Sequence, residues 1–178
     1  LIAAGQDVAL VSDAGTPVVS DPGADLVAAV RGAGGTVVPI PGVSAVATAL
    51  SVCGLSGDRY LFLGFVPRKG PERALLLGRA AREEWPVVFF EAPSRLVPLL
   101  GDLASLAGGT RRAFVGRELT KLHEELRAGT LDELSAYFSE EEPRGEITVV
   151  LDGTAREAPA DRSAEAALSI QMTPLTST

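Results

Sequence analysis

Short apolar runs alternate with amphipathic stretches along the chain, and this alternation predicts a strand followed by a helix several times over. Apolar residues recur at helical spacing in residues 22–31, 44–52, 72–84, 92–103 and 130–138. The apolar runs that predict strands are residues 8–11, 36–40, 60–65, 86–91, 112–117 and 145–151. Alternating strands and helices are typical of α/β proteins, so we expect an α/β fold with mostly parallel sheets.

A break in this pattern divides the chain. Residues 54–58 contain two glycines and no apolar periodicity, which is typical of a linker. We therefore expect two α/β lobes, with residues 1–54 as the C-terminal part of the first lobe and residues 59–152 as the second. Residues 153–178 are rich in Ala, Glu, Ser, Thr and Pro without any period, so we expect a disordered tail.

Residues 8–23 combine glycines, prolines and capping residues, which together shape the backbone. After its apolar run, Gly15, which tolerates a positive φ, and Pro17, which has no N–H, predict a tight loop. Asp21 before Pro22 is typical of a helix N-cap followed by proline at the first helical position. Such a loop lies at the carboxyl edge of an open α/β sheet, where ligands bind, although an ordinary turn between a strand and a helix has the same spacing.

A second loop of this kind follows the apolar run at residues 36–40. Pro41 and Gly42 form a turn, and Ser44 stands at the start of the next helix. Free N–H groups and the positive end of the helix dipole attract anions at such a place. Ser44 is equally well explained as a plain N-cap.

Charged residues at three further places allow a functional or a purely structural interpretation. Glu91 ends a predicted strand, where functional groups gather in α/β proteins, yet Arg95 is placed to pair with it. Arg68 and Lys69 lie on an exposed turn, where they contact either phosphate or only water. Residues 116–127 carry an unusually dense set of charges for a connection.

Composition narrows the class of protein. Of the 178 residues, 46% are hydrophobic. No apolar run reaches the about 18 residues of a membrane span, and no signal peptide is recognisable. We therefore expect a cytoplasmic protein without a membrane partner. A single cysteine, Cys53, and a single histidine, His123, cannot form a disulfide or a Cys/His cluster, so we expect no metal site.

The net charge of −7 argues against a nucleic-acid partner, but the distribution of charge is more informative. Residues 59–127 hold 12 Lys and Arg against 8 Asp and Glu, whereas the rest of the chain holds 4 against 15. A basic middle either faces a phosphate backbone or consists of solvated helix faces.

The beginning of the chain has the pattern of a helix end. Leu1 opens a short helical stretch that Gly5 closes, and the first predicted strand follows at once. We therefore expect that an N-terminal piece, with its strands and sites, is absent.

Six segments resemble, in order along the chain, the tetrapyrrole-methylase-like S-adenosylmethionine enzymes. Each segment is weak alone, but six in register are specific, and the last is most typical of members that methylate ribosomal RNA. The segments are VALVSDAGTP (8–17), SDPG (20–23), PIPG (39–42) with Ser44 and Ala45, GFVPRK (64–69), FEAP (90–93) with Arg95, and RELTKLHEE (117–125).

The resemblance implies an enzyme and its substrate. Members of this kind transfer a methyl group from S-adenosylmethionine to the ribose 2′-hydroxyl of a cytidine in the decoding region of 16S rRNA, in the small ribosomal subunit. The resemblance also implies a homodimer of two-lobed chains, with the cofactor in the cleft between the lobes.

The resemblance further assigns roles to residues of this chain. The residues expected around the cofactor are Ser12, Asp13, Ala14, Gly15, Thr16, Pro17, Pro41, Gly42, Ser44, Ala92 and Thr148. The residues expected to face RNA are Arg68, Lys69, Arg95, Arg117 and Lys121. The hydroxyl proton needs an acceptor, and the catalytic candidates are Glu91, Lys121 with a lowered pKa, and His123, which titrates near neutrality.

Two departures from the family pattern leave alternatives open. The first strand of the family, with its Pro-Ile-Gly-Asn loop, has no counterpart here, and residues 154–178 are acidic where relatives end in basic helices. One alternative is a methylase of tetrapyrroles or similar small molecules, against which residues 117–125 and the basic turn at Arg68 and Lys69 speak. The other is a truncated product that binds RNA or a partner without catalysis.

Overall fold

The computed structural model describes residues 1–140 and 143–154, and within them a sheet of five strands. In their order across the sheet, the strands are β1 (Leu61–Phe65), β2 (Val87–Glu91), β5 (Ile147–Leu151), β3 (Arg112–Arg117) and β4 (Glu125–Thr130). The strands predicted at residues 60–65, 86–91, 112–117 and 145–151 are confirmed, apart from small shifts at their ends. The expected α/β class is confirmed with them.

The directions of the strands differ from the expectation. β1 and β2 run parallel, but β5 lies antiparallel between β2 and β3, and β3 and β4 form an antiparallel hairpin. The expectation of mostly parallel sheets is therefore wrong for this sheet. β5 pairs with strands that precede it by many residues, so no local pattern encodes its direction. β4 was not predicted at all, because it is an edge strand whose one large apolar residue, Leu126, is exposed.

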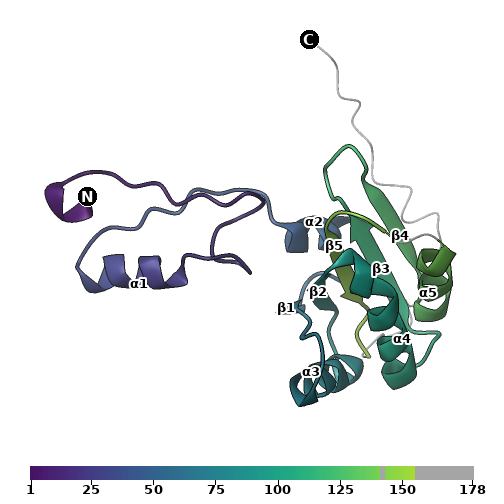
Figure 1. Cartoon of the computed structure of the whole chain (residues 1–178). Helices are drawn as coiled ribbons and strands as arrows, with labels where there is room; N and C mark the ends of the chain where they lie inside the picture. Colours follow the sequence, from purple (N-terminus) through teal and green to yellow (C-terminus); the bar gives the residue numbers. More distant parts are fainter. Residues whose placement is uncertain (141–142, 155–178) are drawn as a thin grey trace, which may run out of the picture.

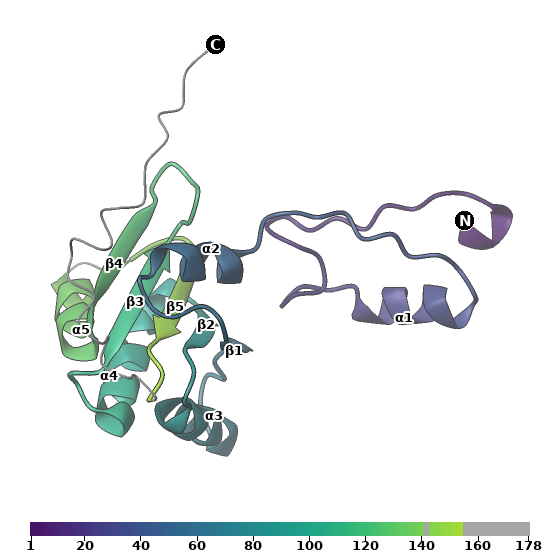
Figure 2. The same ribbon diagram turned by 180° about the vertical axis from the view of Figure 1, so that it is seen from behind.

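Helices cover both faces of the sheet (Figures 1 and 2). α3 (Pro71–Arg82), α4 (Leu96–Ala107) and α5 (Leu131–Glu140) pack on the face that carries Val87 and Phe89. α2 (Ala45–Val52) packs on the opposite face, against Val88 and Phe114. The helices predicted there are confirmed, with a short 3-10 turn, η2 (Pro93–Arg95), ahead of α4. The four leucines that α4 buries completely are those that its sequence spacing turns inward: Leu96, Leu99, Leu100 and Leu103.

Residues 1–44 form an N-terminal arm that extends away from the globular part (Figure 1). The strands expected at residues 8–11 and 36–40 do not form in it. A strand needs a neighbour to satisfy its backbone groups, and no described segment pairs with either stretch. Their side chains stay in solvent accordingly, with Val11 80% and Ile40 81% exposed.

Within the arm, α1 (Ala24–Gly32) occupies the predicted helical stretch, but it starts differently. Its N-cap is Gly23, at φ 132°, and no side chain caps it, so the expected N-cap at Asp21 is wrong. The positive φ, which glycine accepts and other residues resist, ends the preceding loop instead. The expected closure of the first helical stretch is confirmed, because Gly5 ends η1 (Ile2–Ala4) at φ 76°.

Two expectations concern what lies beyond these elements. Within the described residues, no helix is long and apolar enough to cross a bilayer. The tail expected at residues 153–178 lies, from residue 155 onward, outside the described residues.

Candidate active site between the N-terminal loops and the sheet

A cavity of about 640 Å³ lies where the loops of the N-terminal arm meet one end of the sheet. Its lining residues come from the arm, from α2 and from the ends of β1 and β2. The start of β5, the segment before it and the segment after β3 provide the rest. These residues are Asp13, Ala14, Gly15, Thr16, Val19, Ser20, Asp21, Val43, Ser44, Ala45, Thr48, Phe65, Phe90, Glu91, Ala92, Pro93, Leu119, Thr120, Lys121, Gly145, Glu146, Ile147 and Thr148.

The two loops singled out in the sequence form one wall of this cavity together. The hydroxyl of Thr16 donates to the carbonyl oxygen of Val43 at 3.1 Å, across 27 positions of the chain. Gly15, at φ 77°, allows the tight turn that the hydroxyl of Ser12 closes by donating to its carbonyl oxygen at 3.1 Å. Ser44 is the N-cap of α2, where its hydroxyl accepts from the backbone N–H of Ala47 at 3.5 Å. The capping interpretation of Ser44 is therefore confirmed, and the residue also lines the cavity.

Glu91 contributes a buried carboxylate at the end of β2. Its Oε1 accepts from the backbone N–H of Ala92 at 2.8 Å and forms an ion pair with Arg95, so the structural pairing considered above is confirmed. Its Oε2 is buried without a hydrogen-bond partner among the described residues. Burial raises the pKa of this carboxyl group more than the Ala92 N–H and the Arg95 charge lower it.

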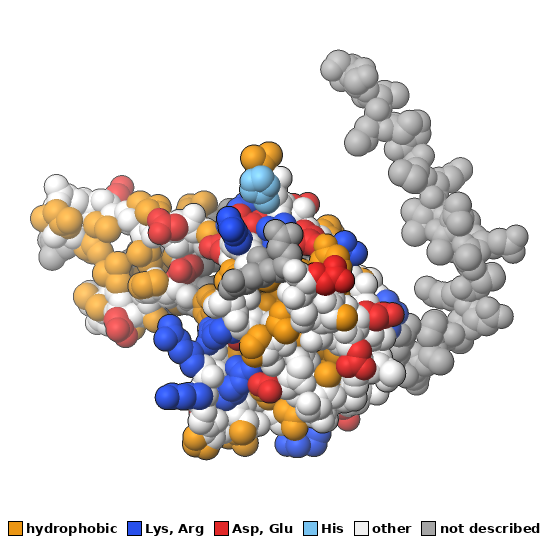
Figure 3. Space-filling view, turned by 45° about the vertical axis from the view of Figure 1, so that its right-hand side comes forward, with side chains coloured by type: hydrophobic (Ala, Val, Ile, Leu, Met, Phe, Trp, Pro, Cys, Tyr) orange, Lys and Arg blue, Asp and Glu red, His pale blue; other side chains and the backbone are white. Residues whose placement is uncertain are grey.

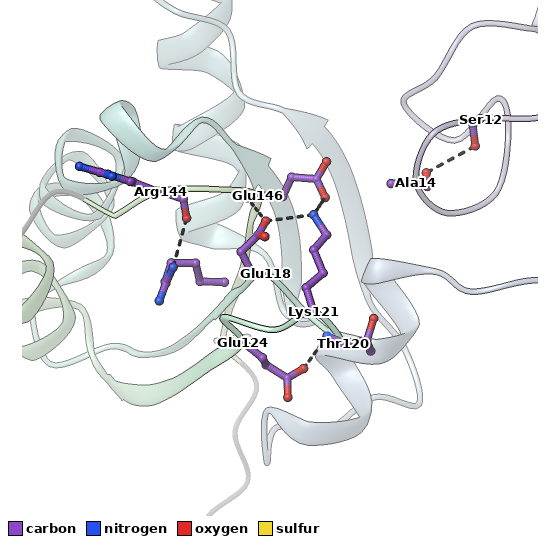
Figure 4. A network of polar contacts seen from close by, with 9 residues as sticks. Ser12, Ala14, Glu118, Thr120, Lys121, Glu124, Arg144 and Glu146 are labelled. Atoms are coloured by element: carbon purple, nitrogen blue, oxygen red, sulfur yellow. Dashed lines mark hydrogen bonds and ion pairs between the residues drawn. The ribbon is translucent and has the colours of Figure 1, made fainter.

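Lys121 forms a network on the opposite side of the cavity from the arm (Figure 4). Its Nζ donates to Oε1 of Glu118 at 3.0 Å and to Oε2 of Glu146 at 2.9 Å. The same Oε1 of Glu118 accepts from the backbone N–H of Glu146 at 2.8 Å. The network thus ties the connection between β3 and β4 to the residue that precedes β5.

This network overturns one expectation about Lys121. Hydrogen bonds from its ammonium to Glu146 and Glu118 raise the pKa of Lys121 above its usual value, whereas a general base needs it lowered. The same contacts, led by the backbone N–H of Glu146, lower the pKa of Glu118. Both charged forms are therefore stabilised, which speaks against Lys121 as a proton acceptor.

The backbone around the network is unusual. Glu118 and Thr120 adopt positive φ angles of 51° and 64°, which L-residues rarely adopt. Thr120 donates its backbone N–H to Oε1 of Glu124 at 2.6 Å, which stabilises the turn. Gly145, at φ 89°, lies directly against the carboxyl group of Glu118, in the space that a Cβ atom would take. Another residue here would strain the backbone and push the Glu118 carboxyl group aside.

The basic residues expected to face RNA fall into two groups. Arg95 pairs with Glu91, and Arg117 forms an ion pair with Glu125 at 2.8 Å, so their charges are compensated within the chain. Arg68 and Lys69 are exposed on the turn after β1 and make no ion pair within the described residues. In Figure 3, Lys and Arg side chains gather on the flank of the globular part below the N-terminal arm.

The cavity gathers many of the sequence candidates but not all of them. Nine line it: Asp13, Ala14, Gly15, Thr16, Ser44, Glu91, Ala92, Lys121 and Thr148. Eight do not: Ser12, Pro17, Pro41, Gly42, Arg68, Lys69, Arg95 and Arg117. His123 does not line it either and is exposed in the connection between β3 and β4.

Sequence reasoning missed several residues of the cavity. The most informative are Phe65 and Phe90, which end two neighbouring strands, and Glu146, which precedes β5. Gly64 and Gly145, which precede Phe65 and Glu146, lie within the strands predicted at residues 60–65 and 145–151. A glycine in a strand is a signal of irregular backbone. The places of Phe65 and Glu146 in the cavity depend on contacts with distant segments, β2 for Phe65 and Glu118 for Glu146.

Comparison with known proteins places these features in a family. Residues 1–135 match the family of Tetrapyrrole (Corrin/Porphyrin) Methylases. A protein named ribosomal RNA small subunit methyltransferase I from Synechocystis is 48% identical over 86% of this chain and 55% of its own length. Proteins of the same name from Mycobacterium tuberculosis and Thermotoga maritima are 51% and 44% identical over 86% of this chain, which covers 54% and 68% of them.

The chain spans about half the length of the first two of these relatives. Among solved structures, the methyltransferase CobJ has a TM-score of 0.60 at 19% identity, covering 79% of this chain and 62% of its own. A uroporphyrin-III C-methyl transferase from Thermus thermophilus, complexed with S-adenyl homocysteine, has a TM-score of 0.55 at 20% identity, covering 78% and 62%. At these identities the likeness concerns the fold.

Proposed function

Because the chain belongs to the tetrapyrrole (corrin/porphyrin) methylase family, we propose that it is part of an S-adenosylmethionine-dependent methyltransferase that acts on RNA of the small ribosomal subunit. The single observation that carries this proposal is the cavity, which joins two arm loops, the buried Glu91 and the Lys121 network around one space of about 640 Å³. A volume of this size suits a nucleoside-sized ligand. The names of the relatives at 44–51% identity support ribosomal RNA as the substrate.

The lining of the cavity fits S-adenosylmethionine. The cofactor carries an ammonium group, ribose hydroxyls and an adenine ring, which need acceptors, donors and apolar contacts. The carboxylate of Asp13 and the hydroxyls of Thr16, Ser44 and Thr148 provide the polar partners, and Ala92 provides a small apolar wall. When bound, S-adenosylmethionine supplies an electrophilic methyl group on a sulfonium centre.

Glu91 is the proton acceptor that we propose for the reaction. The attacking hydroxyl oxygen gains a bond to the methyl carbon, and its proton has to leave. Of the three candidates, Glu91 alone combines a place in the cavity with a buried oxygen that has no partner among the described residues. Its raised pKa brings it nearer to the working pH, which favours proton transfer. Arg95 orients the carboxylate through the other oxygen.

The finer substrate assignment rests on the segment at residues 117–125 and on the basic turn at Arg68 and Lys69. We infer that the methyl acceptor is the 2′-hydroxyl of a cytidine in the decoding region of 16S rRNA. We also infer that residues 1–54 belong to a first lobe of the enzyme, that residues 59–152 form the second, and that the enzyme works as a homodimer.

Transfer of a labelled methyl group tests this proposal. The protein is incubated with methyl-labelled S-adenosylmethionine and small ribosomal subunits that lack the modification, and the digested RNA is analysed for 2′-O-methylcytidine. Label in that nucleoside is the expected result. Label only in a porphyrinoid precursor supplied in parallel would favour the small-molecule alternative instead.

A further inference from the structure

Phe65 is a large aromatic residue that the fold leaves open to the cavity. It is the last residue of β1, lines the cavity and is 55% exposed. The aromatic residues beside it are better covered, since Phe62 and Phe90 are only partly accessible. An exposed phenylalanine costs free energy of hydration that a polar residue would avoid. What distinguishes Phe65 is that its exposed ring belongs to a residue lining the cavity, where a ligand can reach it.

A shift in the register between β1 and β2 determines the face of the sheet on which the Phe65 ring lies. Phe62 pairs with Val88 of β2, so an uninterrupted parallel register would set Phe65 opposite Glu91. Instead the register shifts by one residue, and Phe65 pairs with Phe90. The shift coincides with Gly64, at φ 65°, a conformation that glycine adopts without strain.

The consequence of this bulge is an aromatic cluster. Residues three apart in a regular strand face opposite sides of a sheet, but Phe62 and Phe65 both contact the ring of Phe90. The ring centroids lie 4.9 Å and 5.6 Å from it, in edge arrangements. Phe90 thus packs against one side of Phe65, which also lines the cavity.

Positive charge follows immediately. Arg68 and Lys69 are three and four residues further along, exposed on the turn that leaves β1. A fixed aromatic ring next to free cations is the combination by which proteins bind single-stranded nucleic acid, because a base stacks on the ring and the cations contact its phosphates. The next strand ends in Glu91, so the same wall of the cavity also carries the proposed proton acceptor.

We propose that Phe65 is the stacking surface for the nucleobase of the methylated nucleotide, with Arg68 and Lys69 bound to the adjoining phosphates. This inference rests on the proposed function, since it names how the RNA enters the same cavity. Stacking on Phe65 holds the base at the mouth of the cavity and leaves the ribose toward Glu91. The loops of the arm, with Asp13 and Thr16, would hold the cofactor on the other wall of the cavity.

The variant Phe65→Leu tests the stacking role, with Phe65→Tyr and Phe65→Trp as variants that keep a ring. We expect the KM for unmethylated small subunits to rise about tenfold in Phe65→Leu, within the range typical of one lost stacking contact. In Phe65→Tyr and Phe65→Trp it stays within about twofold of wild type. The affinity for S-adenosylhomocysteine, measured by calorimetry, is unchanged in all three variants.

A matched control is Tyr60→Leu, which removes an exposed aromatic residue just before β1, away from the cavity. It keeps the wild-type KM for small subunits. The double variant Arg68→Ala and Lys69→Ala lowers the salt dependence of RNA binding, because phosphate contacts release counterions.

Three outcomes overturn the stacking proposal. The first is an unchanged KM for small subunits in Phe65→Leu, and the second is an equal rise in Tyr60→Leu. The third is a parallel loss of S-adenosylhomocysteine affinity in Phe65→Leu, which would assign the ring to the cofactor. Failure of the proposed function looks different, because wild-type protein would then transfer no methyl group to small subunits at all.

Discussion

The Nζ atom of Lys121 lies 2.9 Å from Oε2 of Glu146, a residue 25 positions further along the chain. Both residues line the cavity, and Nζ also donates to the carboxylate of Glu118. This arrangement speaks against Lys121 as the base, because hydrogen bonds to two carboxylates stabilise its ammonium form. We therefore propose that Lys121, which the sequence offers as a base, is a positioning residue.

The first prediction follows from this role. Lys121→Met releases the connection between β3 and β4, so the KM for small subunits rises several-fold while kcat falls less than tenfold. Removal of a general base would instead cost about 10²–10⁴-fold in kcat. Lys121→Arg, which keeps the charge, restores most of the KM. Steady-state kinetics of Lys121→Met distinguish the two roles. A loss of more than a hundredfold in kcat together with a changed pH profile would contradict the positioning role.

The second prediction concerns Gly145. An alanine there needs a positive φ and meets the carboxyl group of Glu118, so we expect Gly145→Ala to lower the midpoint of thermal unfolding by about 3–8 °C. Gly101→Ala is the matched control, because an added Cβ in the middle of α4 meets nothing within 4 Å. Higher helix propensity raises stability there by about 1 kcal/mol. Equal unfolding midpoints in the two variants would contradict the account of Gly145.

The third prediction is the effect of Glu91→Gln on catalysis. If Glu91 accepts the proton, kcat falls by about 10²–10⁴-fold, and the acidic limb of the profile of kcat against pH disappears. Affinity for S-adenosylhomocysteine changes little, because the amide keeps the shape of the carboxyl group. A variant with an intact acidic limb would show that another group takes the proton.

The fourth prediction concerns the effect of the raised pKa of Glu91 on the pH dependence of the free energy of unfolding. A carboxyl group whose pKa is higher in the folded state favours folding in its protonated form. Its contribution is complete below the usual pKa of 4.5 and is lost as the pH rises through the raised value. Denaturant unfolding from pH 4 to 8 should therefore give wild-type protein a steeper decline in stability with pH than Glu91→Gln. Glu84→Gln, at an exposed site, should follow the wild type.

The sequence predicted most of the globular part because its signals there are local. Leu96, Leu99, Leu100 and Leu103 recur at helical spacing, and all four are buried in α4. The direction of β5 depends on pairing between Thr148 and Phe90, which lie far apart in the chain. No pattern within either segment encodes that pairing.

The candidate site divides in the same way. Turn chemistry at Gly15 and capping chemistry at Ser44 predicted the two loops from the sequence. The contact between Thr16 and Val43 that joins them was not predicted. The sequence did not predict that Phe65 lines the cavity, because its exposure depends on a register shift against β2. The strands expected in the arm were wrong because apolar runs form strands only beside a partner, and Val11 and Ile40 have none among the described residues.

Calorimetric titration of S-adenosylhomocysteine into the 178-residue chain tests the central claim, that the cavity is a cofactor site, most directly. The account predicts one site per chain, an affinity about tenfold weaker in Asp13→Ala, and wild-type affinity in Asp7→Ala, which changes an exposed aspartate outside the cavity. Absence of binding to the wild-type chain, or equal affinities in wild type and Asp13→Ala, would contradict it.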